Sequence, residues 1–484
     1  MKHRAFLWAL LVMLLVGVFD MTRSISGPLM QKTFSLSYSE LGVLFAAVSI
    51  GYLIGSSSVG FRLNYVEVKF AVLIGGLITM LGLVLAGMAG HFYIAVAAFA
   101  LSGVGSGWME VSVNALIPVL AESKIKASSG SSDAKEFSDF VDSSQPGQQA
   151  GMFNILHGLY GVGAFAFPVV ATWLIARLGG WRPLFVILAA LLLVVLIGVV
   201  ATRFPKTRQH QKPLRHSLQQ ALKQELQPDL EQPLEQELEQ PLELELKQEL
   251  EQPLKQEQPL KQELTQQQQQ PVLASAVKDS NETEWPHQTL QTHEKGLHFS
   301  FTLAGLLVAI TAYVMAEVGV GAWLPTYLVH GRQLSLSHSS MYLSGFYATF
   351  TIGRLLGHLW ISRVGHHRAI LWSTVIAFAF IVVGELRTDW TFAFVLAGVG
   401  FAVIFPTITA IASETFPNHS GKVLGLLFTS AGIGSMVVSW LIGGIASWFG
   451  LNVAFILIPI CLAASLIGLW MSKIPPSNAQ MEVQ

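Results

Sequence analysis

The chain has 484 residues, of which 52% are hydrophobic and 12% are charged. This balance is typical of a polytopic membrane protein and excludes an ordinary soluble domain. The net charge is −1, but residues 225–264 hold twelve acids and three bases, which leaves 26 bases and 18 acids elsewhere. A basic body fits loops that face anionic lipid. Because the basic residues are scattered among apolar segments, no nucleic-acid partner is expected.

Twelve apolar windows of about 20 residues predict an all-α integral membrane protein. The first six lie near 5–30, 39–60, 68–89, 92–121, 148–176 and 182–203, and the second six lie near 299–329, 337–361, 367–386, 390–414, 420–448 and 451–472. The N-terminal run imitates a signal peptide, but we interpret it as an uncleaved first span because eleven more follow. We therefore predict two six-helix bundles, at 1–203 and 299–484, joined by a linker at 204–298.

The predicted linker is a low-complexity segment. It repeats Leu-Glu-Gln and Gln-Pro-Leu, is interrupted by prolines at 228, 233, 241, 253 and 259, and contains five glutamines at 266–270. This composition predicts a disordered tether, with a partner-binding or regulatory segment as the alternative. A second stretch, at 123–149, is rich in Ser, Asp and Gly and predicts a flexible loop.

The distribution of lysine and arginine in short loops predicts the orientation. With the N-terminus in the cytoplasm, eleven of these residues lie inside and five lie outside. Both termini and the linker are then cytoplasmic. We expect a monomeric, multi-pass protein of a cell membrane, specifically a bacterial inner membrane.

No feature of the sequence predicts enzymatic chemistry. The single cysteine, Cys461, allows neither an intramolecular disulfide nor a cysteine-based metal site. We find no nucleophile–base pair, phosphate-binding loop or metal-ligand spacing. Neither a cofactor nor a metal is therefore predicted.

The fourth predicted span places a carboxyl group at bilayer depth. Residues 103–110 read Gly-Val-Gly-Ser-Gly-Trp-Met-Glu, and Asn114 lies one helical turn after Glu110 on the same face. A carboxylate there costs about 2.5–3.5 kcal/mol on insertion scales and normally faces a protein interior or a water-filled cavity. Glu110 is either a buried acid satisfied by a neighbouring helix or a proton- or substrate-binding group. The three glycines predict close approach of neighbouring helices.

Two further carboxyl groups lie inside predicted spans. Asp20 is followed three residues later by Arg23, so it is either a second titrating group or half of a local ion pair. Glu317, in the seventh span, either lines the same cavity as Glu110 or bonds to a tyrosine such as Tyr313. Both alternatives stay open for each residue.

Residues 353–368 carry a recognisable motif, Gly-Arg-x-x-Gly followed by Arg-x-Gly. It resembles the loop motif between spans eight and nine of the major facilitator superfamily. The corresponding stretch of the first half keeps the glycines but not the full acid–base pattern. With two parallel repeats of six spans, the chain resembles this superfamily outside its two inserts. The resemblance implies a gating loop that contains Gly353, Arg354, Gly357 and Arg363.

Within the superfamily, the chain is similar to the fucose–proton symporter family of sugar permeases. The fourth span resembles the family's glycine-rich span with its proton-linked glutamate. Further similarity lies in the fifth span (Asn154, His157, Gly161, Gly163 and Pro168) and at the start of the second half (Tyr313, Glu317, Trp323 and Tyr327).

Two positions depart from the family pattern. The fucose permease has an aspartate late in the first span, and that slot falls on Ser24 here. Asp20 lies one turn earlier on roughly the same face and is the candidate substitute. An asparagine late in the fifth span is replaced by Tyr160. The proton-coupling scheme therefore does not transfer residue for residue.

The resemblance implies proton-coupled uptake of a sugar or similar small polar solute by alternating access. The proton would be carried by Glu110, Asp20 and Glu317, and the substrate would contact Asn114, Asn154, His157, Tyr160, Trp108 and Trp323. For Asn154 and His157, which share a helix face, the alternative is interhelical bonding. For the tryptophans it is ordinary membrane packing. Rival functions are a proton-driven multidrug or metabolite exporter, and a non-transporting sensor or scaffold that uses the acidic linker.

Overall fold

The computed structural model describes residues 2–63, 65–125, 148–205, 300–416 and 419–472, and all regular secondary structure within them is helical. The chain divides into two compact units, one formed by residues 1–207 with 297–484 and one by residues 208–296. The second unit lies outside the described residues, as do most of the predicted linker at 204–298 and of the predicted loop at 123–149. Both therefore stay predictions.

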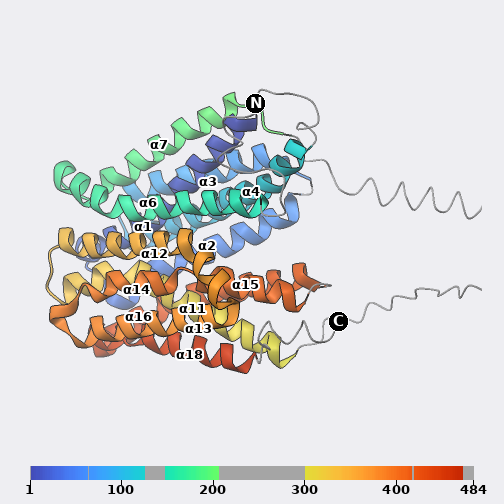
Figure 1. Ribbon diagram of the computed structural model, residues 1–484. Coiled ribbons are helices and arrows are strands. Elements are labelled where there is room, and N and C mark those ends of the chain that lie inside the picture. The colour runs from blue at the N-terminus through green and yellow to red at the C-terminus, as the bar shows by residue number, and fades with distance from the viewer. Residues whose placement is uncertain (1, 64, 126–147, 206–299, 417–418, 473–484) are drawn as a thin grey trace, which may run out of the picture. The chain divides into compact units, whose positions relative to one another are not determined.

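Six helices form the first half of the described structure (Figure 1). They are α1 (Lys2–Phe34), α2 (Tyr38–Arg62), α3 (Val68–Met88), α4 (Phe92–Ile125), α6 (Gln148–Leu178) and α7 (Arg182–Ala201). The start of α2 shows how local sequence fixes a helix end: the Ser37 hydroxyl accepts from the Glu40 backbone N–H, and the Glu40 carboxylate accepts from the Ser37 N–H. These helices confirm the first six predicted spans.

The second half contains the remaining six spans, two of them interrupted. Its elements are α11 (Phe301–Thr326) continued by η1 (Tyr327–Gly331), α12 (Leu336–Val364), α13 (His366–Leu386), η2 (Thr388–Trp390), α14 (Ala393–Phe401), α15 (Ile404–Thr415), α16 (Ser420–Phe449), α17 (Leu451–Phe455) and α18 (Leu457–Met471). Among the described residues, eleven segments are long and apolar enough to cross a membrane. Helix α12, the eighth span in chain order, completes the twelve. It has 29 residues, and its histidines and arginines lower its hydropathy.

The tenth span was predicted as one helix over 390–414 but is broken between Phe401 and Ile404. Pro406 has no N–H to offer the carbonyl of Ala402, four residues earlier, and its ring disfavours a continuous helix. Side chains replace the missing backbone donors: the Tyr313 hydroxyl donates to the Phe401 carbonyl (2.9 Å), and Arg354 Nε donates to the Ala402 carbonyl (3.3 Å).

The predicted close packing around the fourth span is present. A Cβ atom at Gly103 would collide with the Val48 carbonyl on α2, and one at Gly105 would collide with the Gly75 carbonyl on α3. Reciprocally, Gly51 of α2 leaves no room for a Cβ atom beside the Ala100 carbonyl of α4. The backbones of α2, α3 and α4 therefore touch, as small residues allow in membrane bundles.

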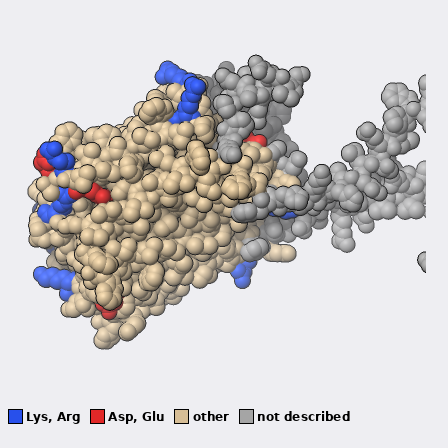
Figure 2. Space-filling view, turned by 90° about the horizontal axis from the view of Figure 1, so that it is seen from below, with Lys and Arg blue, Asp and Glu red and all other residues tan. Residues whose placement is uncertain are grey.

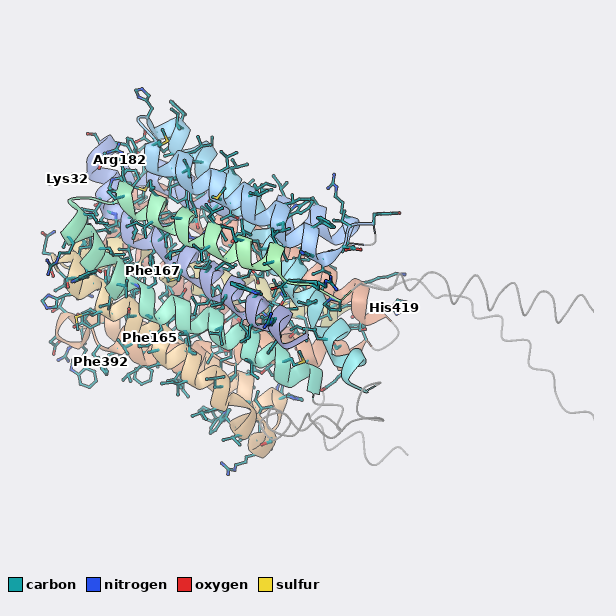
Figure 3. The ribbon with its side chains drawn as sticks, turned by 90° about the horizontal axis from the view of Figure 1, so that it is seen from above. Lys32, Phe165, Phe167, Arg182, Phe392 and His419 are labelled. Atoms are coloured by element: carbon teal, nitrogen blue, oxygen red, sulfur yellow. The ribbon has the colours of Figure 1, made fainter. Side chains whose placement is uncertain are left out.

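The ends of the bundle carry the charged side chains. Lys32 and Arg182 lie at one end and His419 at the other (Figure 3). On the face shown in Figure 2, charged residues lie near the edges and uncharged residues cover the broad area between them. Such an uncharged band fits contact with lipid.

The two halves touch at one end of the bundle, which we call the closed end; it contains the start of α2 and the end of α16. There the Ser39 N–H donates to Ser447 Oγ (2.7 Å), and a Cβ atom at Gly42 would lie 2.8 Å from the Ser439 carbonyl. At the opposite end, which we call the terminal end because α1 begins there, a Cβ atom at Gly60 of α2 or Gly421 of α16 would meet no atom within 4 Å.

The glycine packing predicts opposite effects of one methyl group at two positions of α2. Gly51→Ala should lower the free energy of unfolding by about 1–3 kcal/mol, because the backbone of α4 must move. Gly60→Ala should be neutral or slightly stabilising, because the site is open and alanine is the better helix former. Thermal unfolding of the detergent-solubilised protein measures both. Equal melting temperatures for the two variants would contradict this packing.

Candidate functional site

Asp20 on α1 is bonded to α6 as well as to its own helix. The Tyr160 hydroxyl donates to Asp20 Oδ2 (2.7 Å), and Arg23 Nη2 lies 3.8 Å from Asp20 Oδ1. The pairing with Arg23 is therefore present, but it is long and does not occupy the carboxylate alone. Tyr160, predicted to contact substrate, lies beside a candidate proton carrier.

Ser24 occupies the slot where the related permease has an aspartate. It is fully buried, and its hydroxyl donates to the Gly321 carbonyl of α11 (2.6 Å) and lies 3.2 Å from the Ala322 carbonyl. A serine hydroxyl does not gain and lose a proton as an aspartate carboxyl group does. Ser24 thus ties α1 to α11 across the two halves, and Asp20 remains the predicted substitute for the aspartate.

Glu110 on α4 has a phenol as its neighbour. Its carboxyl group is hydrogen-bonded by the Tyr52 side chain of α2, and it lies close enough to Asp20 to interact electrostatically. One turn later, the buried Oδ1 atom of Asn114 has no hydrogen-bond partner among the described residues. Helix α4 therefore presents a carboxyl group and a free amide oxygen on one face.

Glu317 on α11 interacts with Tyr313, whose hydroxyl hydrogen is donated to the Phe401 carbonyl. It also interacts electrostatically with Asp20 of the first half and with Arg354 of α12. The sequence left two alternatives open for Glu317, a tyrosine-bonded acid or a member of a shared site, and the structure shows the tyrosine contact and the shared site together.

These contacts bring three carboxyl groups from both halves into one group, which we call the carboxyl cluster: Asp20, Glu110 and Glu317. Each member has a tyrosine partner, respectively Tyr160, Tyr52 and Tyr313. The buried Tyr347 on α12 interacts electrostatically with two of the three. Sequence reasoning missed Tyr52 and Tyr347, although a tyrosine in the interior of an apolar span was the available signal.

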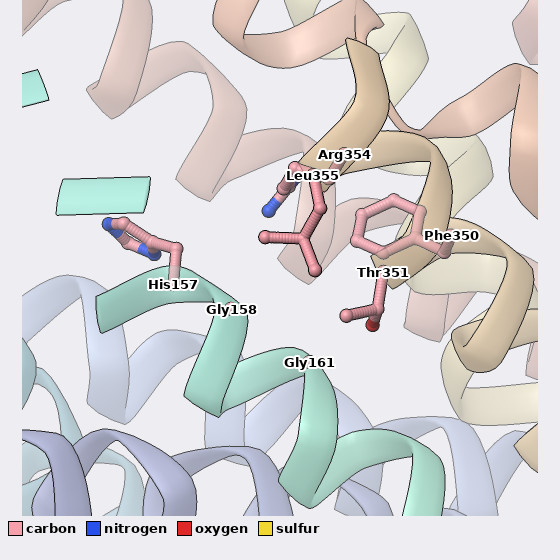
Figure 4. A pocket seen from close by; sticks show the side chains of 7 residues that line it. All are labelled: His157, Gly158, Gly161, Phe350, Thr351, Arg354 and Leu355. Atoms are coloured by element: carbon pink, nitrogen blue, oxygen red, sulfur yellow. The ribbon is translucent and has the colours of Figure 1, made fainter. Parts of the chain in front are cut away.

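A pocket opens between α6 and α12, where the two halves meet (Figure 4). Its cavity volume is about 20 Å³, and it reaches about 310 Å³ only when the open solvent at its mouth is counted; it is lined by His157, Gly158, Gly161, Phe350, Thr351, Arg354 and Leu355. We call it the α6–α12 pocket. His157 reaches it from the first half and Arg354 from the second, where the guanidinium stacks on the Phe350 ring at 4.3 Å from its centroid.

The residues of the predicted gating loop lie in a helix. Gly353, Arg354 and Gly357 fall inside the predicted eighth span at 337–361, and α12 continues to Val364, so it also contains Arg363. The connection to α13 is Gly365 alone, whose φ of +81° suits glycine. Gly353 and Gly357 make room for Ala402 and Val403, the residues at the break of the tenth span. A gating role for these residues stays a prediction.

The two predicted tryptophans are packed away in this arrangement. Trp108 is 8% exposed, contacts Val59 and Ala71, and donates from Nε1 to Ser58 Oγ (2.8 Å). Trp323 is fully buried edge-on against Phe45, with ring centroids 5.2 Å apart. Neither indole face is free to stack on a solute here. The side chain of Asn154 lies outside the described residues, so its predicted role is untested.

Comparison with known proteins places the chain in a family. Residues 8–384 and 306–483 match the model of the Major Facilitator Superfamily. A glucose/galactose transporter of Brucella abortus is 24% identical over 160 residues, which cover 32% of this chain and 39% of the relative. Major facilitator superfamily domain-containing protein 4A of Xenopus tropicalis is 29% identical over 176 residues, or 34% of each chain. The matched segments thus span well under half of these relatives.

Solved structures show the same fold at low identity. The E. coli fucose:proton symporter has a TM-score of 0.54 and 15% identity, with 97% of this chain and 99% of that chain covered. A D-xylose-proton symporter has a TM-score of 0.63 and 15% identity, with 98% of each chain covered. The resemblance expected from the sequence is confirmed: the chain belongs to the Major Facilitator Superfamily and is a multi-pass membrane transport protein, not an enzyme.

Proposed function

We propose that this protein takes up a sugar or a similar small polar solute together with protons, by alternating access. The observation that carries the proposal is the carboxyl cluster. Three groups that can accept a proton lie within membrane-spanning helices, at the place where the two halves meet. Carboxyl groups at this depth mark substrate pathways and proton relays.

Counting charges in and around the cluster favours Glu110 as the proton carrier. Asp20 has Arg23 beside it, and Glu317 interacts with Arg354. Glu110 has a tyrosine and another carboxyl group as neighbours, and no cation is among the described groups that act on it. Because a net buried charge is costly, a proton is the remaining means of balancing Glu110 when the halves close around it.

Hydrogen-bonding groups beside the cluster support a hydroxylated solute. Asn114 offers a free amide oxygen, and His157 faces the α6–α12 pocket. The names of the relatives support the same class: one is a glucose/galactose transporter, and two structural neighbours are fucose and xylose symporters.

The contacts between halves support alternating access. The halves are joined at the closed end, while glycines of α2 and α16 have open space at the terminal end. The bias of lysine and arginine places the terminal end in the cytoplasm of, we propose, a bacterial inner membrane. A transport cycle must then break the contacts of the closed end.

Glu110→Gln should abolish sugar-driven proton movement. On addition of a transported sugar to de-energised cells, the wild type should make the medium alkaline, whereas Glu110→Gln should give no pH change because its amide cannot carry a proton. An exposed acid at the start of α3, Glu67, provides the control variant Glu67→Gln. An undiminished signal from Glu110→Gln would refute its role. If no sugar in a broad panel moves protons while lipophilic cations dissipate an imposed gradient, the exporter alternative replaces this proposal.

A disulfide across the closed end should stop net uptake. The hydrogen bond from the Ser39 N–H to Ser447 Oγ keeps the two Cα atoms within roughly 6–7 Å, inside the range that a disulfide spans. In a Cys461→Ala background, oxidised Ser39→Cys/Ser447→Cys should lose uptake and regain it on reduction. Gly60→Cys/Gly421→Cys, at the open terminal end, is the control and should not cross-link in this state. Full uptake by the oxidised pair would mean that the closed end need not open.

Deleting residues 210–290 should leave sugar uptake nearly unchanged. This segment lies outside the described residues, and the contacts described for the carboxyl cluster are all made by residues of membrane-spanning helices. Uptake per molecule at the membrane is the measurement, with surface abundance determined in parallel. Loss of uptake at normal abundance would favour the sensor or scaffold alternative.

A further inference from the structure

Arg354 is a cation in the middle of a membrane-spanning helix whose charge has no close anionic partner. Its Nε donates to the Ala402 carbonyl, and its guanidinium stacks on Phe350. No ion pair within 4.0 Å involves Arg354 among the residues that the structure describes. Intramembrane cations normally pair with an anion or a backbone carbonyl, or face a water-filled cavity, and Arg354 uses only Nε for its carbonyl contact.

The nearest interacting acid does not occupy the guanidinium. Glu317 acts on Arg354 electrostatically, but no ion pair within 4.0 Å joins the two among the described residues. The other titratable group on the pocket wall is His157, which interacts unfavourably with the Arg354 charge. The α6–α12 pocket is therefore lined by an arginine, a histidine and uncharged groups, with no acid among its lining residues.

We propose that Arg354, on the wall of the α6–α12 pocket, is the counter-ion for the carboxylate of a hydroxylated acid, such as a hexuronate, when alternating access widens this pocket. Because Nε is engaged by Ala402, the two terminal nitrogens remain to donate to the two oxygens of a carboxylate. His157, on the opposite wall, supplies a further N–H donor. This inference rests on the proposed uptake of a small polar solute and names its chemical class.

The position of the pocket suits such a solute. Tyr160 lies three residues after His157 and therefore on the same face of α6, where it bonds to Asp20 of the carboxyl cluster. A carboxylate at Arg354 would direct the hydroxyl groups of the same molecule toward this tyrosine. A neutral sugar would offer no anion to the guanidinium, which would keep only its electrostatic interaction with Glu317.

The test compares galacturonate with galactose in proteoliposomes. The wild type should accumulate galacturonate. Arg354→Gln should lower galacturonate uptake roughly tenfold to hundredfold, the usual worth of a charge-assisted hydrogen bond, while galactose uptake should change much less. Arg354→Lys should retain part of the galacturonate uptake because it keeps the charge. Arg177→Gln, an exposed arginine at the other end of α6, is the charge-loss control.

A measurement on the wild type alone covers the case in which the variants do not fold. Galacturonate should raise the melting temperature of the purified protein more than galactose does at the same concentration. If galactose moves with protons and galacturonate is neither transported nor stabilising, this inference is wrong and the proposed function stands. Galacturonate uptake that Arg354→Gln leaves intact would also overturn it. If neither compound is bound or moved, this inference and the sugar-uptake proposal both fall.

Discussion

A lipid bilayer offers no water to an exposed backbone carbonyl, and this constraint governs the second half of the molecule. Helices satisfy it everywhere except where proline interrupts them. At Pro406 the tenth span breaks, and the carbonyls of Phe401 and Ala402 need donors from elsewhere. They receive them from Tyr313 and Arg354. The break in the tenth span and the positions of Tyr313 and Arg354 therefore depend on each other.

This shared bonding links the site to the shape of a helix. Arg354 cannot turn wholly toward a new anion without releasing the Ala402 carbonyl, which then needs water or another donor. Gly353 and Gly357 hold the same helix against Ala402 and Val403, so α12 and the break pack as a unit. Occupancy of the α6–α12 pocket and the geometry of the tenth span are consequently coupled through a single guanidinium group.

Hydropathy alone predicted the twelve spans, because burying a backbone in lipid leaves few alternatives to a helix. A carboxyl group in an apolar window was equally informative, and it identified Glu110, Asp20 and Glu317. The sequence also named Tyr313 as a partner of Glu317, since the two lie one turn apart. When two residues are this close in sequence, the geometry of the helix alone fixes their relative positions.

Features that depend on neighbouring helices were harder to predict. The contact of Asp20 with Tyr160 joins residues 140 positions apart, and nothing near either residue announces the other. Trp108 looked available beside Glu110, yet the opposite face of α4 packs it against α2 and α3. The motif at 353–363 resembles a loop motif of the superfamily, and only the packing of neighbouring helices shows that Gly353 and Gly357 make room for Ala402 and Val403.

The two halves contribute different numbers of carboxyl groups to the site. Each half contributes a carboxyl group with a guanidinium nearby, Asp20 with Arg23 and Glu317 with Arg354. The first half adds one carboxyl group more, Glu110, whose bonded neighbour is the uncharged Tyr52. Two guanidinium groups balance two carboxylates. The third carboxyl group, Glu110, must therefore gain or lose a proton as water access changes. If a solute carboxylate then pairs with Arg354, Glu317 loses its counter-ion and faces the same requirement, which would make the number of protons moved depend on the charge of the solute.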